Sequence, residues 1–164
     1  MNIKVNFKKQ VFSKSNANLI LFADEKFNIS GLKKHISNSE YSYISDILKK
    51  KDTKKKFLTF DISSKKKIIL VSLKKNLTDS NAENLGAKSY IILNELKETQ
   101  YVVNSDTIPN GLKNILGHFL HGIKLKSYKF EKYKTKKDKG IISINIIGKN
   151  IPNNKDQLKF SSIE

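Results

Sequence analysis

Cysteine is absent from this sequence of 164 residues, which excludes disulfide bonds and thiolate metal sites. Long apolar runs are also missing, because no stretch approaches the roughly 18 apolar residues that a membrane-spanning helix needs. Residues 1–9 alternate apolar and polar side chains and lack the continuous apolar centre of a signal peptide. We therefore expect a cytoplasmic protein without a membrane partner, whose chain starts with a strand.

Arginine is the second absence, since all 32 basic residues are lysine. The net charge is nevertheless +17, and asparagine (17 residues) and isoleucine (21 residues) are abundant. A/T-rich codons encode these three residue types, so a coding bias explains the charge without a polyanionic partner. Lysine alone still supports salt-dependent, non-specific attraction to nucleic acid, whereas base recognition usually recruits arginine. A lysine-rich nucleic-acid-binding module therefore stays open as the alternative function.

Groups suited to catalysis are scarce. Of the three histidines, His118 and His121 lie three residues apart on a predicted helix, and no third ligand with zinc-site spacing accompanies them. The seven glycines form no phosphate-binding loop, the 15 carboxylates are dispersed, and no nucleophile motif occurs. Asp24 and Glu25 follow a predicted strand, where we interpret them as solubilising charges. The sequence predicts no catalytic residue, no metal site and no cofactor in this chain.

The residues that are present predict one layered α/β domain over residues 1–149. Apolar patterns predict strands at 3–7, 19–23, 57–62, 67–73, 101–104 and 141–147. The continuous apolar runs within the second and fourth strands are typical of a mostly parallel sheet that is covered on both faces. Three predicted helices alternate with the strands in the order ββαββαβαβ. We expect the polar residues 150–164 to begin a linker.

Amphipathic stripes predict the three helices. The first begins at a Ser39 cap, the second opens at residue 79 or 80, and the third has Pro109 in its first turn. Gly86 and Ser89 lie on the apolar stripe of the second helix. We therefore expect both residues to pack closely against the sheet.

Aromatic and basic side chains alternate in residues 128–139, YKFEKYKTKKDK. Such aromatic rings can stack on bases while the lysines contact phosphates. The simpler interpretation is a helix end in which Tyr128 and Phe130 pack inward, followed by a solvated basic loop. Both interpretations stay open at this point.

The same segment resembles the end of the N-terminal domain of leucine aminopeptidases, the cytosol aminopeptidase family. That family has the pattern G-x-x-L-x-x-Y-x-F-x-x-Y-K-T/S-K-K before a strand. The matching residues here are Gly122, Leu125, Tyr128, Phe130, Tyr133, Lys134, Thr135, Lys136 and Lys137. Residues 66–73 and 83–87 are similar to a strand and a helix of the family, with Ser72 where glycine is usual. The resemblance covers residues 3–160 approximately.

The resemblance implies a macro-domain-like three-layer α/β fold, with a mixed, mostly parallel sheet flanked by helices. In the family this domain lies on the outside of a homohexamer and is linked to a catalytic domain, which holds two divalent metals, zinc or manganese. The family's metal-binding motif N-T-D-A-E-G-R does not occur in this sequence. Macro domains bind ADP-ribose, but the glycine-rich loops that such phosphate contacts need are missing here.

For the parent protein, the resemblance implies a bacterial leucyl aminopeptidase, a hydrolase that removes N-terminal residues from peptides. For this chain it implies a non-catalytic domain that supports assembly and access to the active sites. Its partners would be its own catalytic domain and the neighbouring subunits. Tyr128, Phe130, Tyr133, Thr135 and the lysines among residues 134–137 are the candidate interaction residues.

Overall fold

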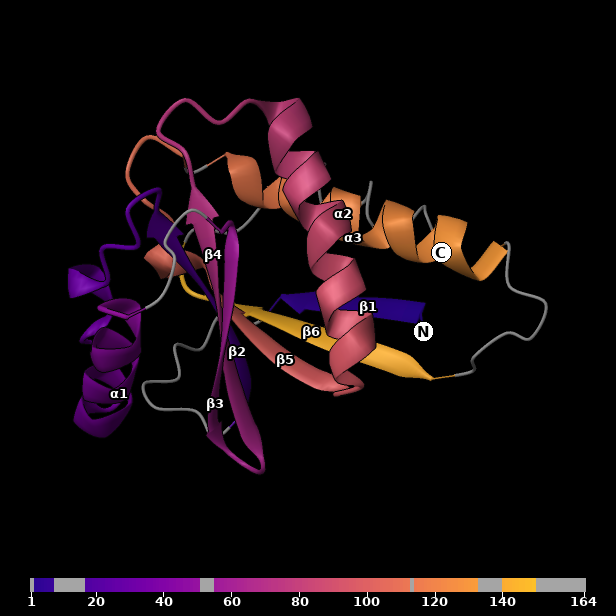
Figure 1. Ribbon diagram of the computed structural model, residues 1–164. Helices are drawn as coiled ribbons and strands as arrows, with labels where there is room; N and C mark the ends of the chain where they lie inside the picture. The colour runs from indigo at the N-terminus through magenta and orange to yellow at the C-terminus, as the bar shows by residue number, and fades with distance from the viewer. Residues whose placement is uncertain (1, 8–16, 51–54, 113, 133–139, 150–164) are drawn as a thin grey trace.

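The strands form one sheet that is parallel except at one edge (Figure 1). The structure, a computed structural model, describes residues 2–7, 17–50, 55–112, 114–132 and 140–149. Its strands are β1 (Asn2–Phe7), β2 (Asn18–Asp24), β3 (Phe57–Ser63), β4 (Lys66–Leu73), β5 (Gln100–Asn104) and β6 (Ile141–Ile147). They lie in the order β1-β6-β5-β2-β4-β3, with an antiparallel pairing between β3 and β4. Each predicted strand is confirmed to within one residue at either end.

The central strands are buried on both faces, as their continuous apolar runs predict. In β2, every residue from 18 to 23 is buried. Ile20 and Phe22 belong to the core on one face of the sheet, and Leu19 and Leu21 belong to the core on the other. Because neighbouring side chains of a strand point to opposite faces, one apolar run supplies both cores.

Helices on both faces of the sheet complete a three-layer fold (Figure 1). The helices are α1 (Asn38–Leu48), α2 (Asp79–Leu96) and α3 (Ile115–Lys132), with short 3₁₀ helices η1 (Ser30–Leu32) and η2 (Ser105–Thr107). Helices α2 and α3 cover one face, whereas α1 and the segment before it cover the other. The three-layer α/β fold with a mixed, mostly parallel sheet is therefore confirmed. The predicted linker at residues 150–164 lies outside the described residues.

The cap of helix α1 lies two residues earlier than predicted. Ser37, rather than Ser39, is the N-cap: its hydroxyl accepts a hydrogen bond from the amide of Glu40, and the Glu40 carboxylate accepts one from the amide of Ser37. This reciprocal capping box satisfies two amides at once, which a cap at Ser39 would not do. The prediction of Ser39 as the cap is wrong.

Helix α3 starts later than Pro109, so that prediction is also wrong. The amide of Leu112 donates to the carbonyl of Pro109 at 3.1 Å, which closes a turn and not a helix. Gly111 has a φ of +92°, outside the helical region, and it interrupts the chain before Ile115. The amphipathic stripe does form a helix, but the helix begins only at Ile115, after the non-helical Gly111.

Gly86 packs against α3 and not against the sheet, which corrects the expectation for this residue. A Cβ at Gly86 would lie 1.9 Å from the carbonyl oxygen of Phe119, and one at Gly122 would lie 1.9 Å from that of Glu83. The two glycines therefore let the backbones of α2 and α3 touch where they cross. Ser89 does face the sheet, and its hydroxyl donates to the carbonyl of Leu85 at 2.9 Å.

Candidate functional site

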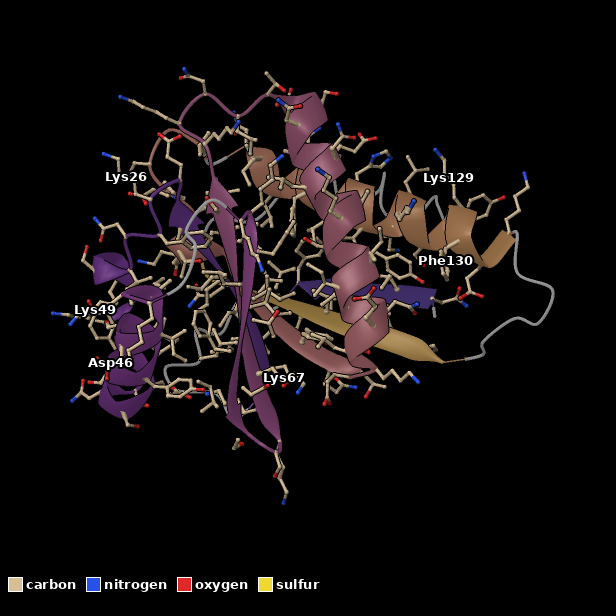
Figure 2. All side chains as sticks on the ribbon, viewed as in Figure 1. Lys26, Asp46, Lys49, Lys67, Lys129 and Phe130 are labelled. Carbon is tan, nitrogen blue, oxygen red and sulfur yellow. The ribbon has the colours of Figure 1, made fainter. Side chains whose placement is uncertain are left out.

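The end of α3 carries Tyr128 and Phe130, the two candidate interaction residues that the structure describes. Their exposed fractions are 52% and 39%, so the interpretation in which both side chains pack inward does not hold. Ser127 and Glu131 take the buried positions of these last turns, which turns the two aromatic residues outward. Figure 2 shows Phe130 and Lys129 at the far end of α3. Residues 133–137 lie outside the described residues.

Tyr128 borders a groove between α3 and the outer strand β1. The cavity has a volume of about 330 Å³. Its described lining residues are Asn2, Ile3, Lys4, Lys124, Ser127, Tyr128 and Ile141. The ring of Phe130 instead packs edge-on against Tyr90, with 5.9 Å between the ring centroids. An exposed aromatic ring beside lysine side chains is the arrangement that contact with a single-stranded nucleic acid requires.

The two histidines of α3 link it to α2. Nε2 of His118 lies 3.4 Å from an oxygen of Asp79, and Nδ1 of His121 lies 3.2 Å from an oxygen of Glu83. Because the helices cross at their glycines, residues spaced three and four apart meet in pairs. Within the described ranges, no group of three or more histidine, aspartate or glutamate side chains is arranged to hold a metal ion.

A histidine lies at the carboxyl ends of β2 and β5, where α/β sheets commonly bind ligands. The Asn104 side-chain oxygen accepts from the amide of Asp106, which turns its NH₂ group toward Nδ1 of His35 at 3.0 Å. In this assignment Nδ1 accepts, so the neutral ring carries its proton on Nε2. Burial, and then the charge of Lys34, lower the pKa of His35 despite the opposing effect of Asp106. Nε2 of His35 is buried and has no hydrogen-bond partner among the described residues.

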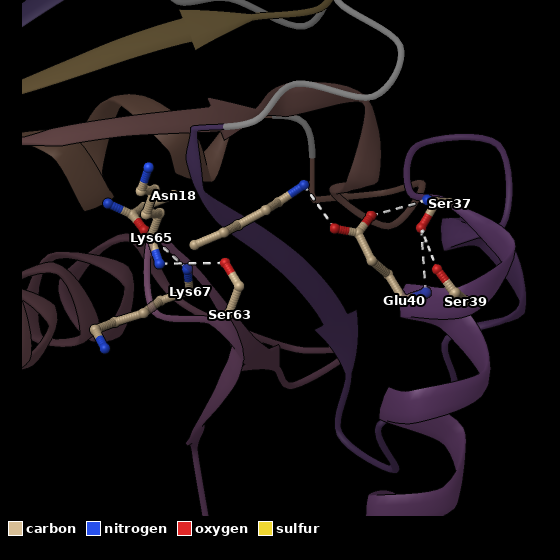
Figure 3. Close-up of polar contacts among 8 residues, drawn as sticks. Asn18, Ser37, Ser39, Glu40, Ser63, Lys65 and Lys67 are labelled. Atoms are coloured by element: carbon tan, nitrogen blue, oxygen red, sulfur yellow. Dashed lines mark hydrogen bonds and ion pairs between the residues drawn. The ribbon is translucent and has the colours of Figure 1, made fainter.

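At the amino end of β4, lysines are paired with carboxylates. Nζ of Lys66 lies 2.6 Å from Glu40, and both side chains are only 10% exposed. Figure 3 shows Glu40 between this contact and the cap of α1. Burial opposes ionisation of Glu40, but the contacts with Lys66 and Ser37 outweigh it and lower its pKa. The neighbouring Lys67 contacts Asp61 at 2.9 Å on the exposed surface.

At the carboxyl end of β4, lysines gather around a cavity of about 720 Å³. They come from the loop after β2, the residues just before β3, the residue after β4 and the exposed face of α2: Lys26, Lys55, Lys56, Lys74 and Lys88. Figure 2 places Lys26 on the opposite side of the molecule from Lys129. Sequence analysis missed this lysine pocket, because only the pairing of β3 with β4 and the position of α2 bring its residues together.

Asp24 positions one part of this pocket. Its carboxylate accepts hydrogen bonds from the amides of Lys26 and Asn28 at 3.0 and 2.9 Å, which fixes the turn after β2. Asp24 is therefore a turn-forming residue and more than the solubilising charge that we expected.

No helix in the described part of the chain is long and apolar enough to cross a membrane.

Comparison with known proteins places the fold. No protein-family model matches this sequence, and no curated protein matches it by sequence. A variant of tomato leucine aminopeptidase is similar in structure, with a TM-score of 0.71 and 16% identity over 99% of this chain. The macrodomain of Thermus aquaticus DarG is also similar, with a TM-score of 0.56 and 8% identity over 90% of this chain.

The lengths covered differ between these two structures. This chain corresponds to 35% of the tomato aminopeptidase chain but to 100% of the macrodomain. At such low identity the likeness shows the fold alone, a macro-domain-like three-layer domain. The structural resemblance to a leucine aminopeptidase agrees with the resemblance of the sequence motif around Tyr128 and Phe130.

Proposed function

We propose that this chain is a non-catalytic N-terminal domain of a cytosolic metallo leucyl aminopeptidase. The observation that carries the proposal is the extent of the likeness: nearly the whole chain matches about a third of an aminopeptidase chain. A domain of that size is a part of the enzyme and leaves most of the enzyme's length to other parts. The sequence motif of residues 122–137 adds independent support.

The contacts of the carboxylates also favour a structural domain. Glu40 and Asp61 pair with lysines, Asp79 and Glu83 contact the histidines of α3, and Asp24 fixes a turn. A two-metal peptidase needs several carboxylates that converge on the metal ions. Here these carboxylates are spread over the fold and engaged in separate contacts, so we assign the two metals, zinc or manganese, to a separate catalytic domain.

In this proposal the domain supports assembly of a homohexamer and shapes access to the active sites. Its partners are its own catalytic domain and neighbouring subunits, and the parent enzyme removes N-terminal residues, leucine above others, from peptides in the cytoplasm. The exposed end of α3, with Tyr128 and Phe130, is the surface that we assign to these contacts.

Hydrolysis of leucine p-nitroanilide tests the proposal. We expect residues 1–164 to release no p-nitroaniline above the rate of buffer with manganese or zinc, and the full-length product of the gene to release it rapidly. Activity of residues 1–164 alone would show that the domain is catalytic. A full-length product that hydrolyses nothing with either metal would remove the parent enzyme from the proposal.

Nucleic-acid binding is the second candidate function, and one observation favours it. Tyr128 is exposed next to Lys4 and Lys129, so a ring and positive charges are available together. We expect weak, non-specific binding whose affinity falls steeply between low and physiological salt. Fluorescence anisotropy with a labelled oligonucleotide measures it. Affinity that is independent of salt, or unchanged in Tyr128→Ala, would count against this function.

A further inference from the structure

The lysine pocket concentrates positive charge in a concave site. Glu25 is the one carboxylate among its described lining residues, against five lysines. Among the residues that the structure describes, none of these lysines forms an ion pair, whereas Lys66 and Lys67 at the other end of β4 both do. The fold therefore pairs Lys66 and Lys67 with carboxylates, whereas the five lysines of the pocket share a lining that contains one carboxylate, Glu25.

Rigid elements hold the central lysines in place. The amide of Ser72, in β4, donates to the carbonyl of Lys56 at 2.8 Å, so Lys56 extends the pairing of β3 with β4. Lys88 lies on α2, one turn after the buried Leu85. The positions of these two lysines thus follow from the sheet and from a packed helix and do not depend on a free loop.

Lys56 and Lys88 line the same cavity, close enough for the charge of one to affect the other. The pKa of Lys56 is lowered. The charge of Lys88 is the largest cause, burial is the second, and the charge of Lys74 lowers the pKa further. Like charges at such distances repel each other. An anion between them would reverse that repulsion.

We propose that this pocket binds an anion that carries two or more adjacent phosphate groups. Lysine binds phosphate as a point charge, and ammonium groups that arrive from separate elements suit several linked charges better than one. The amides of Asn81 and Asn84, on the first turns of α2, line the same cavity and can donate further hydrogen bonds. The cavity volume lies within the range of small-molecule sites. The inference does not depend on the aminopeptidase role.

Tripolyphosphate is the probe that tests the proposal. Titration of the folded chain, by calorimetry at constant ionic strength, should give saturable binding to one site. The double variant Lys56→Gln/Lys88→Gln should weaken that binding about tenfold or more, because it removes two charge-assisted contacts. The matched control Lys49→Gln/Lys65→Gln removes the same charge from exposed positions outside the pocket and should bind as the unsubstituted chain does.

Equal loss of binding in both double variants would overturn the proposal, since it would show attraction to net charge alone. Absence of saturation would overturn it as well. A short single-stranded oligonucleotide distinguishes the sources of the phosphates. If it displaces tripolyphosphate, the pocket takes a nucleic-acid backbone; if it does not, the pocket takes a soluble oligophosphate.

Acetylation of the unsubstituted chain provides a measurement that needs no variant. An amine with a lowered pKa is deprotonated more often and reacts faster with an acetylating ester. Mass spectrometry should show that tripolyphosphate slows acetylation at Lys56 and Lys88 and leaves the rate at Lys65 unchanged. Equal slowing at all three lysines, or no slowing at Lys56, would refute the pocket as the binding site.

Discussion

The two ends of strand β4 carry lysines in opposite circumstances. At the amino end, Lys66 is nearly buried against Glu40 at 2.6 Å, and Lys67 contacts Asp61. At the carboxyl end, Lys56, Lys74 and Lys88 line one cavity, with no ion pair among the described residues. Lysines therefore differ between the two ends of β4. They pair with carboxylates at the amino end, whereas at the carboxyl end lysines from several elements line the cavity that we propose as an anion site.

This contrast refines what a net charge of +17 means. A coding bias toward lysine would supply lysines without regard to position, and most of the lysines that the structure describes are exposed. The position of each lysine in the fold then decides whether it stabilises the native state or contributes to binding. A lysine that pairs with a buried carboxylate stabilises the native state. Lysines that line one cavity without such pairs attract an anion from solution.

The largest effect is expected when the pair at the amino end is broken. Glu40→Gln should lower the free energy of unfolding by about 3 kcal/mol, because it leaves the buried Lys66 ammonium without its charged partner. Glutamine keeps the capping box of α1 possible, so the substitution isolates the charge from the cap. Urea unfolding followed by circular dichroism measures the change.

Asp61→Asn is the matched control at the same end of β4. The Asp61 side chain is 72% exposed, so its pair with Lys67 should contribute under about 1 kcal/mol. If both substitutions cost equally little, the amino end of β4 would not be held by its ion pair, and the contrast between the two ends would disappear.

Acid should weaken the amino end selectively. The pKa of Glu40 is lowered in the folded state from its ordinary value of 4.5, so the unfolded chain binds this proton first. The stability that Glu40 contributes is therefore complete above that ordinary value and is lost as the pH falls through the lower folded pKa. Unfolding free energies measured against pH should show the wild-type and Glu40→Gln curves converging in acid. Curves that stay parallel would contradict this linkage.

The fold was predictable because its signals are local. Continuous apolar runs such as 19–23 determine a doubly covered strand by themselves, and each strand was located to within one residue. The helix boundaries were less predictable, because they depend on choices between neighbours. Ser37 and Ser39 are equally good caps in isolation, and only the reciprocal bond with Glu40 selects Ser37.

The site was much less predictable because its contacts are non-local. Lys56 and Lys88 are separated by β3, β4 and the start of α2, and nothing in their spacing shows that they line one cavity. The packing of Gly86 on Phe119 has the same character, since helical periodicity identifies an inner face without saying what covers it. For the same reason, the sequence left open whether Tyr128 and Phe130 pack inward or are exposed.

The buried hydroxyl of Tyr101 should affect stability less than Glu40 does and more than Lys88 does. The hydroxyl of Tyr101, in β5, is buried and makes no hydrogen bond to a described residue, and burial raises its pKa. Tyr101→Phe should leave stability unchanged or raise it by up to about 1 kcal/mol, because it removes a polar group that lost its water on folding. Thermal unfolding checks this, with the exposed Tyr43→Phe as the control. A loss above that size would reveal a partner for the hydroxyl.

The smallest effect on stability is expected at the carboxyl end. Lys88→Gln removes one of two repelling charges, so the free energy of unfolding should stay within about 0.5 kcal/mol of the wild-type value, at or above it. Any gain should fade as salt is added, since screening already weakens the repulsion. Urea unfolding at low and high salt tests this beside Lys65→Gln. If Lys88→Gln were as destabilising as Glu40→Gln, Lys88 would be a structural residue like Lys66, and the two ends of β4 would no longer differ in kind.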